Sequence, residues 1–463
     1  MPHSIKPDSG LFDGKQDERP SDEINNFRRA LMLGAGMLAA GWQSAEAETP
    51  AANSTEASII DRSCRVSSVR LDELVAKAYP SFNNPVILPA FDAKTQGARF
   101  SVDLHRIVTA TTIPETGERL KISGLLAVPV GAKGNIPLLS WQHGTIFSFG
   151  QVPSNLMRLA DSSYELTDAA DSLETLFNIQ RFAGQGYAVI AADYIGHGPF
   201  RNGQSEPYLV KGATVSTCLG ILEAGQSAMR QLGLNPSKLF LHGWSQGSLN
   251  TLWLHQALSA KSRPIAGTAV SSPFTDLNEA WRFWGGALTF PPPEGVTSYP
   301  ELADWVSLCM IISLGSYERY YGLKGLMKTA IRPEYHDLAM TFWTSYQLDP
   351  SQIKSIPSSK NLLVPGLFER FTAPQNSAFL RRCATNRATY WAYDSPVRFN
   401  YGLADEAINP ALVYPALAAG GPLVTGVPVP GGSHRGTFLA GLYGSQNTLS
   451  GSDNVLAWFN SLG

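Results

Sequence analysis

Ser245 lies in the sequence Gly243-Trp244-Ser245-Gln246-Gly247, and its surroundings indicate chemistry more clearly than those of any other residue. An apolar run typical of a buried strand precedes this Gly-x-Ser-x-Gly pattern, and a helical-looking run follows it. In such a strand–turn–helix elbow the serine takes strained backbone angles, and large side chains two positions away would clash. The sequence therefore predicts a serine hydroxyl exposed at a helix N-terminus, where it can act as a nucleophile.

A serine hydroxyl becomes a good nucleophile only when an imidazole takes its proton and an acid orients that imidazole. Along the chain the expected order is serine, acid, histidine. His434 fits the base, because it lies in a Gly-rich loop after the last predicted strand and no other histidine follows His336. Asp405, at the end of the preceding predicted strand, fits the acid. Glu406 is the near alternative, and Asp276 is a more distant one.

Two backbone N–H groups are needed to stabilise the oxyanion that forms when the serine attacks a carbonyl. One is expected from Gln246, directly after the nucleophile, and the other from the loop after the predicted strand 136–141. That loop contains His143-Gly144-Thr145, so the N–H of Thr145 is the second candidate and His143 is assigned to shaping the loop. A plain turn glycine at Gly144 is the alternative interpretation.

The elements around these residues alternate between short apolar strands and helices from residue 100 to 276 and again from 392 to 463. This alternation predicts an α/β fold, with a mainly parallel sheet covered by helices on both faces. Residues 277–391 do not follow this alternation of strands and helices, which indicates an inserted helical cap. Residues 48–99 are assigned to an N-terminal extension with a short helix ended by Pro80.

The predicted cap is dense in aromatic residues, which fits either a core of its own or the lining of a pocket for a bulky, apolar substrate. These residues are Trp281, Phe283, Trp284, Phe290, Trp305, Tyr317, Tyr320, Tyr321, Phe342, Trp343 and Tyr346.

The composition excludes some classes of partner. The 463 residues are 44% hydrophobic and 16% charged, with a formal net charge of −2 and no basic stripe, so nucleic-acid binding has no electrostatic support. No Cys or His spacing fits a metal site, and no motif implies a cofactor. Nothing in the sequence sets an oligomeric state.

The first 47 residues resemble a secretory signal peptide. Arg28-Arg29 precedes an apolar run, residues 30–42, and the small-x-small sequence Ala45-Glu46-Ala47 follows. The paired arginines resemble the twin-arginine export signal of bacteria. The apolar run is too short to span a bilayer, so the mature chain is expected in the periplasm or secreted, without a stable membrane anchor. A buried amphipathic helix is the alternative.

Four cysteines follow that predicted cleavage site: Cys64, Cys218, Cys309 and Cys383. In an exported protein an even number permits two disulfides, with three possible pairings. Four reduced, buried thiols are the alternative, because packing alone often buries cysteine.

Three motifs support a resemblance that extends from about residue 100 to the end of the chain. They are Trp141-Gln142-His143-Gly144-Thr145, Asp193-Tyr194-Ile195-Gly196 with Pro207-Tyr208-Leu209-Val210, and Gly402-Leu403-Ala404-Asp405-Glu406. With the elbow, they resemble the α/β-hydrolase superfamily with a cap after the sixth strand, and within it secretory lipases and exported bacterial carboxylesterases. The resemblance implies Ser245 as nucleophile, Asp405 as acid and His434 as base. Ser248 departs from many lipases, which have a second glycine there.

The expected function is therefore hydrolysis of carboxylic esters through an acyl-enzyme, with an apolar or bulky ester, small-molecule or polymeric, as the expected substrate. A peptidase or amidase with the same three residues is one alternative. A binding protein with a silent site is the other.

Overall fold

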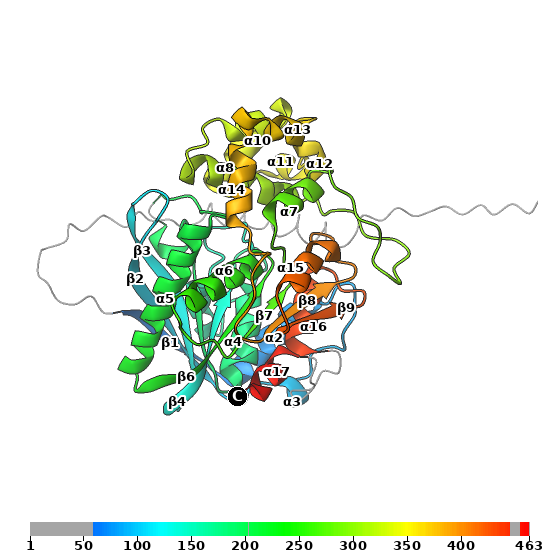
Figure 1. Ribbon diagram of the computed structural model, residues 1–463. Helices are drawn as coiled ribbons and strands as arrows, with labels where there is room; N and C mark the ends of the chain where they lie inside the picture. The colour runs from blue at the N-terminus through cyan, green and yellow to red at the C-terminus, as the bar shows by residue number, and fades with distance from the viewer. Residues whose placement is uncertain (1–58, 202, 445–453, 463) are drawn as a thin grey trace, which may run out of the picture.

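A nine-stranded sheet lies at the centre of the part of the chain that the structure, a computed structural model, describes: residues 59–201, 203–444 and 454–462 (Figure 1). The strand order is β1-β2-β3-β5-β4-β6-β7-β8-β9. The strands are β1 Ile60–Val66, β2 Val102–Thr112, β3 Arg119–Pro129, β4 Gly134–Gln142, β5 Ala188–Ala192, β6 Leu234–Trp244, β7 Gly267–Ser271, β8 Val397–Gly402 and β9 Val424–Val429. From β1 to β5 neighbours are antiparallel, and from β5 to β9 they are parallel. The predicted mainly parallel sheet is confirmed.

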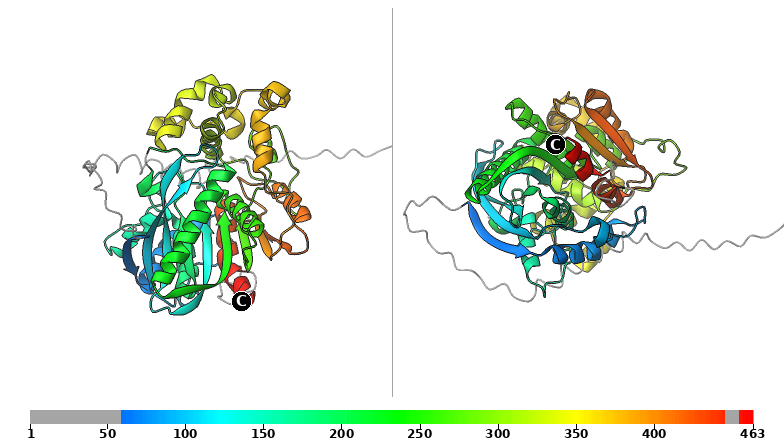
Figure 2. Two further views of the ribbon diagram at one scale, coloured as in Figure 1. Left: turned by 60° about the vertical axis from the view of Figure 1, so that its left-hand side comes forward. Right: turned by 90° about the horizontal axis from the view of Figure 1, so that it is seen from below.

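The central strands are apolar because helices cover both of their faces. Strands β5 and β7 are buried along their whole length, as expected for parallel strands between two helical layers. One layer contains α5 and α6, whose Leu222 and Leu252 belong to one hydrophobic core. The other layer contains α4 and α16, whose Phe177 and Phe438 belong to a second core (Figure 2).

The helices of these layers and of the sheet edges are α2 Ser68–Phe82, α3 Ala93–Gln96, α4 Leu173–Arg181, α5 Lys211–Gln231, α6 Gln246–Ala260, α15 Tyr414–Ala419, α16 His434–Tyr443 and α17 Val455–Ser461. Short 3₁₀ helices are η1 Pro153–Ala160, η2 Ala183–Gln185, η3 Gly198–Phe200 and η6 Pro410–Leu412. Within the described ranges, no helix combines the length and the apolar character needed to cross a membrane.

A group of helices between β7 and β8 forms the cap, which lies above the sheet in Figure 1. They are α7 Leu277–Trp284, α8 Val306–Tyr320, α9 Leu326–Ala330, η4 Pro333–Tyr335, α10 His336–Ser345, α11 Pro350–Lys354, α12 Ser359–Leu362, α13 Leu367–Thr372, η5 Pro374–Asn376 and α14 Ala378–Asn386. Helix α8 is buried almost throughout, and its Leu308 and Ile311 join the core that also contains α5 and α6. The cap is thus packed onto the sheet domain through a shared core.

The segment before residue 100 contributes more structure than the sequence indicated. Strand β1 pairs antiparallel with β2 at the edge of the sheet, and α2 continues past Pro80, where the sequence predicted its end. Strand β1 escaped prediction because its residues are mostly polar and partly exposed, as an edge strand permits. The predicted signal peptide, residues 1–47, lies outside the described residues.

The four cysteines are free thiols, so the predicted disulfides are wrong. They lie on four separate elements, and three of them contact groups other than a second cysteine. Cys64 on β1 is half-buried and donates to the carbonyl of Met157, whereas the other three are buried. Cys309 on α8 contacts the Tyr208 hydroxyl, and Cys383 on α14 contacts that of Tyr317.

Candidate active site

Ser245 lies at the turn between β6 and α6, with a φ of 57° and a ψ of −124°. A positive φ is strained for a residue with a side chain and is maintained only by its surroundings. A Cβ on Gly243 would collide with the carbonyl of Gly247, and a Cβ on Gly247 would collide with the carbonyl of Gln142. Glycine at both positions therefore allows the turn that raises Ser245 above the sheet.

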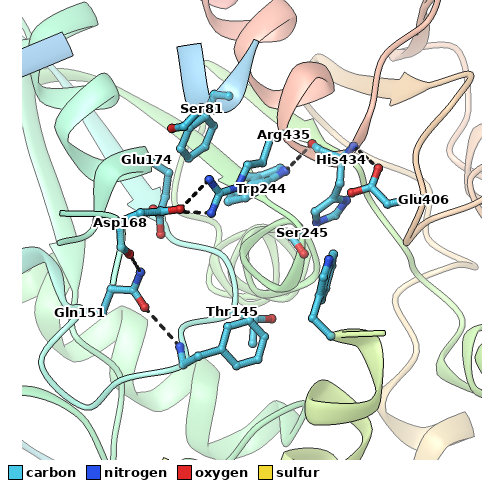
Figure 3. Close-up of a pocket in the computed structure, with 13 residues that line it drawn as sticks. Ser81, Thr145, Gln151, Asp168, Glu174, Trp244, Ser245, Glu406, His434 and Arg435 are labelled. Carbon is cyan, nitrogen blue, oxygen red and sulfur yellow. Dashed lines mark hydrogen bonds and ion pairs between the residues drawn. The ribbon is translucent and has the colours of Figure 1, made fainter. Parts of the chain in front are cut away.

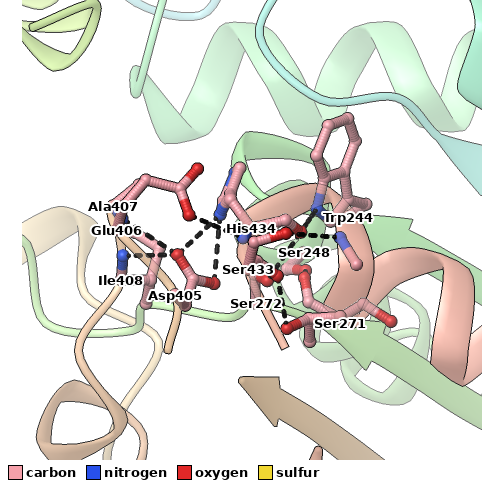
Figure 4. Close-up of polar contacts among 12 residues, drawn as sticks. Trp244, Ser248, Ser271, Ser272, Asp405, Glu406, Ala407, Ile408, Ser433 and His434 are labelled. Atoms are coloured by element: carbon pink, nitrogen blue, oxygen red, sulfur yellow. Dashed lines mark hydrogen bonds and ion pairs between the residues drawn. The ribbon is translucent and has the colours of Figure 1, made fainter. Parts of the chain in front are cut away.

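Ser248 belongs to the framework of this turn. Its hydroxyl donates to the carbonyl of Ser271 at 2.6 Å and lies 3.2 Å from that of Gly243, so it ties the start of α6 to β7 (Figure 4). The residue is fully buried and is not part of the pocket lining. The departure from glycine at this position therefore adds a structural hydrogen bond.

His434 and Asp405 are hydrogen-bonded to each other although 29 residues separate them. His434 begins α16, and its Nδ1 lies 3.0 and 3.1 Å from the two carboxylate oxygens of Asp405 (Figure 4). The backbone N–H groups of Ala407 and Ile408 donate to Asp405 Oδ1 at 3.0 and 2.9 Å. These amides fix the carboxylate, and the carboxylate in turn fixes the orientation of the imidazole.

The two alternative acids have other partners. The carboxylate of Glu406 accepts the backbone N–H of His434 at 2.9 Å, so it contacts the main chain of the histidine and not its ring (Figure 4). Burial and the charge of Asp405 raise the pKa of Glu406. Asp276 caps α7, accepting the N–H groups of Asn278 and Glu279. Only Asp405 contacts the imidazole among these three candidates.

The imidazole of His434 lies between two indole rings. Its centroid is 5.0 Å from that of Trp244 and 5.4 Å from that of Trp305, a cap residue. Burial lowers the pKa of His434, but the charges of Asp405 and Glu406 outweigh this effect and raise the pKa above its ordinary value. The site therefore favours an imidazole that accepts a proton readily.

Thr145 and Gln246, the two expected oxyanion donors, come from different parts of the chain. Gln246 is the first residue of α6, so its backbone N–H has no acceptor within the helix. Thr145 follows β4 and lines the same pocket as Ser245 and His434. His143 is buried, stacks on Tyr194 at 4.1 Å, and places its Nδ1 2.8 Å from the carbonyl of Gly144. Burial lowers its pKa to about 4. It therefore supports the loop.

A small cavity of about 100 Å³ opens beside Ser245 and His434. Figure 3 shows Ser245 at its centre, with His434 on one side and a pair formed by Arg435 and Asp168 on the other. The guanidinium donates two hydrogen bonds to the carboxylate, at 2.8 and 3.1 Å. The further lining residues are Ser81, Phe82, Thr145, Phe147, Gln151, Glu174, Trp244, Trp305 and Glu406. The pocket thus has an aromatic wall and a polar wall.

The sequence did not predict this polar wall. Asp168 and Glu174 come from a long connection and from α4, and neither lies in a recognisable motif. Burial raises the pKa of Glu174 to about 7. Arg435 is adjacent to the predicted base, and that position was the one available signal. In the described part of the chain, no group of three or more His, Cys, Asp or Glu residues is placed to hold a metal ion.

Comparisons with known proteins identify the fold. No protein family model matches the sequence, and no curated protein matches it. A putative hydrolase from Legionella pneumophila has a similar structure, with a TM-score of 0.67 at 16% identity over 87% of this chain and 98% of that one. The rice cell wall degrading esterase LipA from Xanthomonas oryzae gives 0.62 at 19% identity, over 83% and 95%. The chain has the α/β-hydrolase fold. Lipase A from Candida antarctica, in its closed state, is more distant, with 0.53 at 12% identity over 87% and 90%.

In this α/β-hydrolase fold, most of the aromatic residues of the cap form a core. Among the described residues that line the pocket beside Ser245, Trp305 is the single one from the cap. Trp281, Tyr317 and Phe342 are fully buried in the core that the cap shares with the sheet domain. Burial in the core therefore accounts for more of the aromatic residues of the insert than the pocket beside Ser245 does.

Proposed function

We propose that this protein hydrolyses carboxylic esters through an acyl-enzyme formed on Ser245. The observation that carries the proposal is the pairing of His434 Nδ1 with Asp405, in a pocket that Ser245 also lines. This pairing leaves the other ring nitrogen, Nε2, available to take the proton of the serine hydroxyl. The solved structures of similar fold include proteins called an esterase and a lipase, which agrees with this chemistry.

In the proposed reaction, Ser245 Oγ attacks the ester carbonyl while His434 removes its proton. The resulting oxyanion accepts hydrogen bonds from the backbone N–H groups of Gln246 and Thr145. His434 then gives the proton to the leaving alcohol, which departs as the acyl-enzyme forms. Water attacks that acyl-enzyme with His434 again acting as base, and the acid is released. The cycle needs neither a cofactor nor a metal ion.

We further propose that the mature enzyme is exported to the periplasm or secreted and lacks a stable membrane anchor. The support is the leader-like sequence of residues 1–47, with Arg28-Arg29 ahead of a short apolar run. In that setting the substrate is a small-molecule ester or an accessible ester on a polymer. Nucleic acid is not a partner, because the chain has no basic stripe.

The size of the cavity predicts a preference for short acyl groups. Its volume of about 100 Å³ is small beside the roughly 300–1,000 Å³ of pockets that hold drug-sized ligands. With nitrophenyl esters, we expect kcat/KM for acetate or butyrate to exceed that for octanoate by about tenfold or more, since a full pocket discriminates strongly against added methylenes. A parallel series of acetates of different alcohols serves as the control. Rates that rise with acyl length would place the acyl chain outside this cavity.

A side-by-side assay separates the proposed function from its two rivals. We expect nitrophenyl acetate to be hydrolysed and the matched acetanilide to be left intact, because an anilide is a poorer acyl donor. Comparable cleavage of both would instead indicate a peptidase or amidase. A fluorophosphonate probe should label Ser245, because the probe reacts with an activated serine. A protein that neither reacts with the probe nor turns over esters would be a binding protein.

A further inference from the structure

A short segment, residues 205–209, contacts both proposed oxyanion donors. The Gln246 amide nitrogen Nε2 donates to Glu206 Oε1 at 2.6 Å. The hydroxyl oxygens of Thr145 and Tyr208 are 2.7 Å apart and hydrogen-bonded. Residues from two different parts of the chain are thus held by side chains two positions apart in one segment. We call residues 205–209 the bridging segment.

The cap holds the same segment from the other side. The Ser316 hydroxyl of α8 donates to the carbonyl of Glu206 at 2.6 Å and accepts the N–H of Tyr208 at 3.0 Å. Tyr346, which follows α10, donates its hydroxyl to Glu206 Oε2 at 3.0 Å. Tyr317 of α8 donates to the carbonyl of Leu209 at 3.2 Å. Helix α8 and the residue that follows α10 are therefore hydrogen-bonded directly to the bridging segment.

The bridging segment has little freedom to absorb such a shift. Glu206 and Tyr208 are both 2% exposed, and Glu206 Oε2 also lies 2.9 Å from His197 Nε2. A Cβ on Gly196 would lie 2.5 Å from the nitrogen of Glu206. The backbone at Gly196 and the backbone of the bridging segment are therefore in direct contact. Leu209 has a φ of 57°, which a leucine adopts only under constraint.

We propose that the bridging segment couples the cap to the oxyanion hole, with Tyr208 and Glu206 as positioning residues that act through Thr145 and Gln246. This inference rests on the proposed function. Anchoring the side chains of Thr145 and Gln246 restricts the backbone on either side of Ser245, where the two N–H donors must point at the oxyanion. Stabilisation at that point acts on the transition state, so its loss lowers kcat and leaves KM nearly unchanged.

A matched pair of variants separates this role from plain packing. Tyr208→Phe and Tyr317→Phe each remove one buried phenol hydroxyl. The Tyr208 hydroxyl bonds to Thr145, a proposed oxyanion residue, whereas the Tyr317 hydroxyl bonds to the backbone of the bridging segment at Leu209. For Tyr208→Phe we expect kcat on a short-chain ester to fall about tenfold with KM within about twofold, less than the 10²–10³ that loss of an entire donor costs. For Tyr317→Phe both constants should stay within about twofold of wild type, since Ser316 and Tyr346 still hold Glu206 and Tyr208 from the cap.

Two further measurements distinguish a loss of oxyanion stabilisation from a loss of folded protein. A boronic acid inhibitor, which forms an oxyanion-like adduct on Ser245, should bind Tyr208→Phe more weakly by the same factor as kcat falls, about tenfold. Thr145→Val removes the same hydrogen bond from the other side, so the double variant should lose no more than either single variant. Thermal melting identifies any variant that merely unfolds.

The outcomes distinguish the inference from the proposed function. If the wild-type protein hydrolyses esters and Tyr208→Phe keeps a kcat within about twofold of it, the coupling alone is overturned. Additive losses in the double variant would also overturn it. A wild-type protein that ignores esters and the fluorophosphonate probe would remove the proposed function, and the coupling with it.

Discussion

If Ser245 is the proposed nucleophile, replacing it with alanine is expected to lower ester turnover about 10⁶-fold, as the same loss does in known catalytic triads. Without the hydroxyl no acyl-enzyme can form, and only the oxyanion donors and binding remain to accelerate direct attack by water. The elbow itself should survive. Its backbone hydrogen bonds run from the N–H of Ser245 to the carbonyl of Ser271 at 3.0 Å and from the N–H of Ser248 to that of Ser245 at 2.9 Å, and alanine keeps both.

The matched control for this variant is Ser248→Ala, three residues along the same helix. It removes the hydrogen bond to Ser271 and leaves a buried carbonyl with one partner fewer, which costs about 1–3 kcal/mol of folding free energy. We therefore expect a lower melting temperature with fluorophosphonate labelling retained, whereas Ser245→Ala should melt normally and resist labelling. Turnover by Ser245→Ala within about tenfold of wild type would refute the assignment of Ser245 as nucleophile, because removal of a triad nucleophile leaves far less activity.

The parts of the fold that could be predicted from the sequence are those where local pattern and burial agree. The strand predicted over residues 136–141 is β4, which spans Gly134–Gln142, because a short apolar run that ends in turn residues marks a buried strand. Strand β1 was missed because an edge strand can be polar. The disulfides were wrong because spacing along the chain says nothing of distance in space.

The sequence likewise predicted some features of the site and not others. Fold order selected Ser245 and His434 as candidates, and the structure places both in the lining of one pocket. Fold order was not enough to separate Asp405 from Glu406, because adjacent residues at a strand end differ only in the direction of their side chains. That direction is set by the turn after β8, in which two backbone amides hold the Asp405 carboxylate. Trp305 joins the pocket from the cap, and no sequence pattern marked it apart from its aromatic neighbours.

Asp405→Asn should cost turnover about 10⁴-fold, the scale seen when the acid of a triad is replaced by its amide. The carboxylate accepts the Nδ1 proton of His434 and so keeps Nε2 free to act as a base toward Ser245. An asparagine can present its NH₂ group there instead, which would favour the opposite tautomer and place the ring proton on Nε2. The turnover of Glu406→Gln should stay within about tenfold of wild type. The glutamine side-chain oxygen can still accept the backbone N–H of His434, so a neutral hydrogen bond replaces a charged one.

The pH dependence of kcat/KM provides a second readout that structural damage would not imitate. The charges of Asp405 and Glu406 both raise the pKa of His434, so removing either charge should lower that pKa and move the acid limb of the profile to lower pH. Asp405 acts through direct contact with the ring as well as through charge, so its replacement should produce the larger shift. If Glu406→Gln instead lost more activity and shifted the limb further, the acid role would pass to Glu406. The imidazole would then have to turn away from the contact with Asp405 before it could serve Ser245.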